Sequence, residues 1–149
     1  MANMIQYAKE QVSRVIAQAY EKAAAAGALP GGVAVKGTVE IPKDPKNGDY
    51  AASFAMAGAK AMKMAPRAIA QALVDHMDLG DTPFASVEIA GPGFLNFRLG
   101  HRWYGQVLSA IESEGALYGQ SQEGQGKRVM VEFVSANPTG PMHMGNARG

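Results

Sequence analysis

Apolar residues recur every three or four positions between residues 4 and 26, which is the spacing of one face of an α-helix. This stripe contains Ile5, Ala8, Val12, Val15, Ile16 and Ala19. Asn3 precedes it as an N-cap residue, and Gly27 follows it as a residue that ends helices. Lys and Arg do not cluster on the polar side, so we expect the helix to pack on a protein core rather than lie on a membrane.

Two other stretches alternate apolar and polar residues, the pattern of half-buried β-strands. The first, Val35–Ile41, predicts one short strand. The second, residues 84–99, predicts two strands that meet at the turn formed by Gly91, Pro92 and Gly93. A hairpin with one apolar face must bury that face, so a layer of helices is expected on it.

Three more helices are predicted, over residues 50–63, 66–77 and 101–114. Asp49 is interpreted as the N-cap of the first of them, and Pro66 suits the first turn of the second. Together these elements predict an α+β fold, in which helices pack on a small, mostly antiparallel sheet.

The composition of the chain excludes several classes of function and leaves the predicted fold unchanged. The chain has 149 residues, with 14 Lys and Arg against 13 Asp and Glu, a net charge of +1. This balance excludes a binder that depends on bulk positive charge, although it allows a few chosen contacts to nucleic acid. Cysteine is absent, which excludes disulfides and thiolate metal sites, and the three histidines lie far apart, so no metal site is expected.

No segment has the pattern of a signal peptide or a membrane span, since apolar runs stay far shorter than about 20 residues. We therefore expect a cytoplasmic protein without membrane contacts.

The composition changes after Tyr118. Residues 119–127 are polar and rich in Gly and Gln, which predicts a linker between a domain at 1–118 and a second domain that begins within 128–149. Residues 129–134 are nearly all apolar, as in a buried parallel strand. We expect this strand to be the first of a truncated, Rossmann-like domain. Without sheet partners it is expected to be partly disordered or to self-associate through 129–134.

The segment VEFVSANPTGPMHMGN, residues 131–146, resembles the first strand and the HxGH signature of class I aminoacyl-tRNA synthetases, and arginyl-tRNA synthetases in particular. GDYA at 48–51 and GPGFLNF at 91–97 are similar to the N-terminal additional domain of that family. The resemblance implies that the parent protein is a monomeric ligase that activates arginine with ATP and Mg²⁺ and transfers it to tRNA-Arg. The chain alone is expected to be inactive, because it lacks most of the nucleotide-binding fold.

The resemblance also implies the residues that bind ATP. They are His143 and Asn146, taken as catalytic, together with Gly145. Spaced three apart at a helix start, His143 and Asn146 can donate to the charge that develops on the α-phosphate. The family usually has His where this chain has Asn146, and an amide cannot become cationic, so its phosphate contact is expected to be weaker.

Glu132, Ser135 and Asn137 match the positions that bind arginine in the family, where a carboxylate suits a guanidinium group. Judged from the residues alone, Glu132 is better interpreted as an outward-facing charge that protects an edge strand from aggregation.

Phe94 and Asn96 match the pair that contacts the D-loop at the tRNA elbow. A spacing of two residues places both on one face of a strand, where an aromatic ring can stack on a base and an amide can bind its edge. The alternative interpretation is that neither residue binds RNA: Phe94 belongs to the core, and Asn96 is a turn residue beside Gly91, Pro92 and Gly93.

Two other functions are compatible with the pattern. One is a free-standing α+β adaptor that binds RNA or a protein without catalysis. The other is a complete small enzyme that uses His143 and Glu132 as acid and base, which one strand and one loop are too little to support.

Overall fold

The computed structural model of the chain describes residues 3–34, 36–121, 124–132 and 140–144. The chain divides into two units, residues 1–119 and 120–149, which are described separately here. All the α-helices and β-strands of the described residues lie in the first unit.

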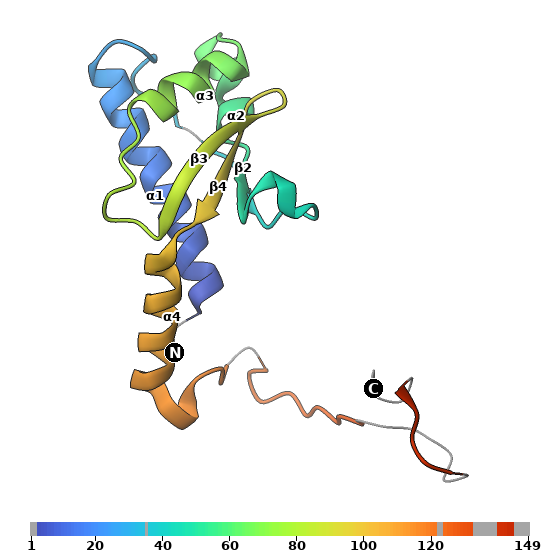
Figure 1. The fold of residues 1–149 in the computed structure, drawn as a ribbon. Helices are drawn as coiled ribbons and strands as arrows, with labels where there is room; N and C mark the ends of the chain where they lie inside the picture. Colours follow the sequence, from blue (N-terminus) through green and yellow to red (C-terminus); the bar gives the residue numbers. More distant parts are fainter. Residues whose placement is uncertain (1–2, 35, 122–123, 133–139, 145–149) are drawn as a thin grey trace. The chain divides into compact units, whose positions relative to one another are not determined.

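The first unit contains helices and short strands, and its strands follow one another in pairs along the chain (Figure 1). Its elements are α1 (Met4–Ala25), β1 (Val39–Glu40), β2 (Tyr50–Ala52), α2 (Phe54–Met62), α3 (Pro66–Asp75), β3 (Phe84–Ala90), β4 (Phe94–Leu99) and α4 (His101–Glu114). Two 3₁₀ turns, η1 (Pro45–Asn47) and η2 (Gly115–Leu117), complete it.

The four strands form one sheet in the order β1-β2-β4-β3, and every neighbouring pair is antiparallel. The predicted α+β fold with an antiparallel sheet is therefore confirmed. β4 lies between β2 and β3, and its Asn96 is opposite Ala51 on one side and Glu88 on the other.

The core lies between the sheet and the helices α1, α2 and α3. From β4, Leu95 and Phe97 enter it fully buried, and the Phe97 ring lies 5.1 Å from that of Phe84. Ile16 of α1 and Leu73 of α3 are equally buried. Because successive strand residues point to opposite faces, the alternate residues of β4 face away from this core and form an outer face of the sheet.

Helix α1 confirms its prediction to within one residue. The Asn3 side chain accepts a hydrogen bond of 3.0 Å from the backbone N–H of Gln6, as an N-cap does. The predicted stripe is buried except for Ile5, which is 53% exposed because it lies in the first turn at the end of the core. Helix α4 has the predicted bounds and ends at Gly115, whose φ is +53°.

The predicted helix 50–63 is wrong at its start. Residues 50–52 form β2, and helix α2 begins at Phe54 after Ser53. Asp49 consequently caps no helix. Tyr50–Ala52 is fully buried and pairs with β1 and β4 at once, and this pairing overrides the helical preference of its alanines.

The predicted strand 35–41 is shorter than expected, since only Val39–Glu40 pairs with β2, and residue 35 lies outside the described residues. The other predicted helix, 66–77, corresponds to α3 and begins at Pro66 as predicted.

The second unit is described at residues 120–121, 124–132 and 140–144. No strand is present in these ranges, so the part of the predicted strand that is described, 129–132, is unpaired here, and residues 133–134 lie outside the described residues. A strand requires a hydrogen-bonded neighbour, and none is present among the described residues. The Rossmann-like strand therefore stays a prediction. Among all the residues that the structure describes, no helix has the length and apolar character that crossing a membrane requires.

Candidate nucleic-acid interface

A hollow of about 270 Å³ lies on the outer face of the sheet, and we call it the outer hollow. Its walls come from the sheet, from the loop after β1 and from the turn between β3 and β4. It is lined by Glu40, Pro42, Asn47, Ala51, Ala90, Gly91, Pro92, Phe94 and Asn96. This volume is near the lower end, about 300 Å³, of ordinary ligand pockets, so it suits one planar group rather than a run of nucleotides.

Phe94 and Asn96 both line the outer hollow, so the structure brings this predicted pair together. Asn96 is only 7% exposed, yet its side-chain amide makes no hydrogen bond to any described residue. The small side chain of Ala51, opposite Asn96 on β2, leaves space beside it. Phe94 is half-buried and lies outside the core cluster. An aromatic ring next to a free, recessed amide is a suitable arrangement for holding a base.

One wall of the outer hollow, the loop 42–49, is fixed to β4 by several hydrogen bonds. Arg98 donates to the backbone carbonyls of Pro45, at 3.0 Å, and Lys46, at 2.8 Å. Asp49 accepts from the N–H of Leu99 at 2.8 Å, and its own N–H donates to the carbonyl of Phe97 at 2.8 Å. Asp49, predicted as a helix cap, therefore holds this loop on the sheet.

The opposite wall, the turn between β3 and β4, is fixed to helix α3. Arg67 donates to the carbonyl of Gly91 at 3.0 Å. Gly93 has a φ of +142°, and a Cβ built there would lie 3.0 Å from backbone and side-chain atoms of Pro66. Both walls are thus held by contacts outside the outer hollow, so little ordering is needed when a ligand enters.

The charges around the outer hollow are mixed. Glu40 is one of its lining residues, and the exposed Glu88 lies opposite Asn96, while the exposed Lys43 and Lys46 belong to the loop 42–49. Such a surface supports recognition of one group with few phosphate contacts rather than bulk attraction to a polyanion. The described parts of the chain contain no cluster of acidic and histidine side chains suited to a metal ion.

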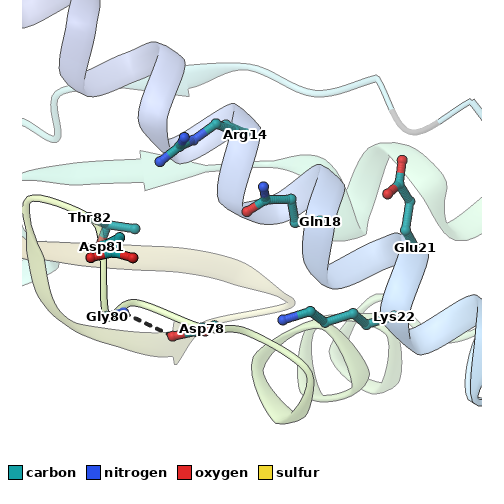
Figure 2. Close-up of a pocket in the computed structure, with 8 residues that line it drawn as sticks. All are labelled: Arg14, Gln18, Glu21, Lys22, Asp78, Gly80, Asp81 and Thr82. Atoms are coloured by element: carbon teal, nitrogen blue, oxygen red, sulfur yellow. Dashed lines mark hydrogen bonds between the residues drawn. The ribbon is translucent and has the colours of Figure 1, made fainter.

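A second hollow, of about 430 Å³, lies between helix α1 and the loop after α3 (Figure 2). Figure 2 shows Arg14 and Lys22 on the helix side and Asp78 and Asp81 on the loop side. The Asp78 carboxylate already accepts from the N–H of Gly80 at 2.9 Å. Among the described residues that line this hollow none is aromatic, and its three carboxylates outnumber its two cations, so the outer hollow is the better candidate for nucleic acid.

Six residues were predicted to bind ATP or arginine, and two of them are described. Glu132 and His143 are both exposed in the second unit. Ser135, Asn137, Gly145 and Asn146 lie outside the described residues. The assignment of these six residues to ATP and arginine stays a prediction.

Asn47, which lines the outer hollow, and Arg98, which binds the loop that forms one of its walls, were not anticipated from the sequence. Asn47 lies in a loop rich in turn-forming residues, where the pattern indicates only a turn. The alternation within β4 indicates that Arg98 faces outward, but it contains no signal for the carbonyls more than 50 residues earlier that Arg98 binds.

Comparison with known proteins agrees across family, sequence and fold. A family described as "Arginyl tRNA synthetase N terminal domain" matches residues 8–99. Among curated proteins, an arginine–tRNA ligase of Acetivibrio thermocellus is 45% identical over 149 residues, which are 100% of this chain and 26% of that protein. A second, from Symbiobacterium thermophilum, is 48% identical over 97% of this chain and 26% of its own length. The chain thus spans about a quarter of these relatives.

Among solved structures, the arginyl-tRNA synthetase of Plasmodium falciparum is similar in fold, with a TM-score of 0.54. It is 13% identical, and the match covers 69% of this chain and 18% of that one. This likeness concerns the fold alone.

Proposed function

The chain belongs to the arginyl-tRNA synthetase family, as its N-terminal domain, and from this we propose that it is the tRNA-contacting part of an arginine–tRNA ligase. The outer hollow is the surface we assign to that contact, and an unstacked base of the D-loop is the group it holds. The observation that carries the proposal is that Asn96, a residue only 7% exposed whose side-chain amide makes no hydrogen bond to a described residue, lies with Phe94 in one hollow.

The chemistry of this pair supports a single-stranded base. Bases in RNA loops are recognised by stacking on aromatic side chains and by hydrogen bonds to their edges. Removing such a stack costs about 1–3 kcal/mol, or about 5- to 150-fold in affinity. With a net charge of +1 and mixed charges at the hollow, we expect binding to fall only shallowly as salt increases.

The test is a titration of the chain, followed by NMR chemical shifts, with tRNA-Arg and with a tRNA-Arg altered only in its D-loop. We expect shifts centred on Phe94 and Asn96 that disappear with the altered D-loop. Shifts scattered over lysines would contradict the proposal. Tight, sequence-independent RNA binding at physiological salt would instead favour an adaptor domain.

We further propose that the complete protein activates arginine and transfers it to tRNA-Arg. ATP is the substrate that supplies the adenylate group for this activation. His143, Gly145 and Asn146 are assigned to ATP with its Mg²⁺, and His143 and Asn146 to catalysis. Glu132, Ser135 and Asn137 are assigned to arginine. Support comes from the motif at 131–146 and from the two relatives, which are named as arginine–tRNA ligases and align with 100% and 97% of this chain.

A chimera tests this assignment. The chain replaces the matching 149 residues of the Acetivibrio thermocellus relative, and arginine charging is measured. The chimera should be active, Glu132→Gln should raise the KM for arginine, and His143→Ala should lower kcat. An inactive chimera that still folds would contradict the assignment, and the chain alone should charge nothing.

We also propose that the linker at 119–127 separates the domain 1–118 from a domain that begins at 128, and that the chain self-associates through 129–134. Val129, Met130 and Val131 are 77%, 93% and 65% exposed, an apolar run of the kind that pairs between molecules. Sedimentation should show association that is lost when residues 120–149 are removed. Identical sedimentation of both chains would contradict it.

A further inference from the structure

The loop that forms one wall of the outer hollow presents an amide of its own. Asn47 lines the hollow together with Asn96, but it comes from η1, whereas Asn96 comes from the middle of β4. The Asn47 side chain is exposed, and it makes no hydrogen bond within the described part of the chain. The outer hollow therefore has one free amide on its recessed floor and another on its wall.

The backbone that leads to Asn47 is held by hydrogen bonds within η1 and from Arg98. Its N–H donates to the carbonyl of Asp44 at 3.0 Å, and the Asp44 carboxylate accepts from the N–H of Lys46 at 3.0 Å. Arg98 then binds the carbonyls of Pro45 and Lys46, which are the two residues immediately before Asn47. These hydrogen bonds give the Cα of Asn47 a set position relative to β4.

Arg98 suits this task because its guanidinium group is a planar fork. It reaches two successive carbonyls at 3.0 and 2.8 Å with two different nitrogens. A lysine at the same position carries a single point charge and would hold one carbonyl well. Arg98 lies two residues beyond Asn96 on β4, so its side chain is on the same outer face. The strand that carries one amide therefore also positions the other.

We propose that Asn47 is a specificity-determining residue that contacts a second position on the edge of the base held by Phe94 and Asn96, and that Arg98 is the positioning residue for Asn47. The inference rests on the proposed function, since it names a further contact within the same site. Each amide offers two N–H donors and one carbonyl acceptor. Two amides that approach one base from different sides discriminate bases, because a wrong base leaves one of them unpaired.

The experiment measures how strongly the chain discriminates between bases. The probes are tRNA-Arg transcripts that carry each of the four bases at the D-loop position whose change most weakens binding by the unaltered chain. Asn47→Ala should reduce the ratio of the best to the worst dissociation constant about tenfold. Lys46→Ala is the matched control on the same loop, and it should weaken all four transcripts by the same factor.

Arg98 is tested through Asn47. Arg98→Met should reduce discrimination as Asn47→Ala does, and it should add nothing in an Asn47→Ala background, because both changes remove the same contact. Arg98→Lys should recover part of the loss. Unfolding in urea shows that each variant is folded, and the amide shift of Asn47 reports whether its backbone has moved.

The outcomes separate this inference from the proposed function. If Asn96→Ala and Phe94→Ala lose D-loop recognition while Asn47→Ala keeps full discrimination, the role of Asn47 is refuted and the proposed function stands. If Asn96→Ala and Phe94→Ala also bind all transcripts as before, the proposed function itself fails. An additional loss from Arg98→Met in the Asn47→Ala background refutes the positioning role.

Discussion

Replacing Gly48 by alanine should destabilise the first unit by about 3 kcal/mol. Gly48 has φ of +89° and ψ of −174°, a backbone region that is almost exclusive to glycine and costs other residues about 1–3 kcal/mol. An added Cβ would also lie 2.8 Å from the carbonyl oxygen of Phe97. That oxygen accepts the hydrogen bond from Asp49, so moving it breaks a bond worth about 1 kcal/mol. About 2 kcal/mol of strain and 1 kcal/mol of lost bonding give the total.

Gly27→Ala is the matched control for this change. Gly27 also has a positive φ, of +73°, but a Cβ built there meets no atom within 4 Å. Only the left-handed backbone then costs free energy, about 1 kcal/mol. The difference between the two variants, about 2 kcal/mol, therefore combines the extra backbone strain at Gly48 with the lost contact between the loop and β4.

Urea unfolding of both variants provides the assay. With a slope of about 2 kcal/mol per molar urea, the midpoint should fall by about 1.5 M for Gly48→Ala and about 0.5 M for Gly27→Ala. The N–H of Leu99 donates a hydrogen bond to the Asp49 carboxylate in the native structure, and its hydrogen should exchange faster with solvent in Gly48→Ala but not in Gly27→Ala. Equal midpoints for the two variants would refute the reasoning.

Other predictions concern pH, capping and the core. Burial, and then the charge of Asp49, raise the pKa of Tyr50 above its usual 10.0, so folding favours the neutral phenol. The contribution of Tyr50 to the free energy of unfolding is fully present below pH 10 and is lost as the pH rises through the native pKa. In thermal melts at alkaline pH, Tyr50→Phe should therefore reduce the loss of stability, whereas the exposed control Tyr104→Phe should leave it unchanged. Asn3→Ala should cost about 1 kcal/mol in urea unfolding, and an unchanged midpoint would contradict its role as a cap. Phe97→Ala should cost about 3–5 kcal/mol by the same assay, and a cost below that of Asn3→Ala would mean that Phe97 does not anchor the core.

The sequence predicts the helices and the hairpin well because their signals are local. The stripe of α1, the proline at the start of α3 and the alternation of β3 and β4 each follow from residues close in sequence. It fails at residues 50–52, whose alanines favour helix locally. Their strand conformation depends on pairing with β4 more than 40 residues later, which no local pattern contains.

The candidate site likewise contains residues that could be predicted from local sequence and one that could not. Phe94 and Asn96 could be named from a resemblance, and their spacing alone places both on one face of a strand. Asn47 could not be found in this way, because its relation to Asn96 depends on a loop held by Arg98 and Asp49. Those hydrogen bonds join positions about 50 residues apart.

The ties between the loop 42–49 and β4 also bear on the order of folding. The two arms of Arg98 close loops of 53 and 52 residues, and such closures are slow because many conformations must be given up first. Helix α1 can form early from local contacts, whereas the outer hollow cannot exist until β4 has entered the sheet between β2 and β3. During synthesis, the surface that holds the base would therefore be among the last parts of the first unit to form, and RNA binding would report a completed sheet.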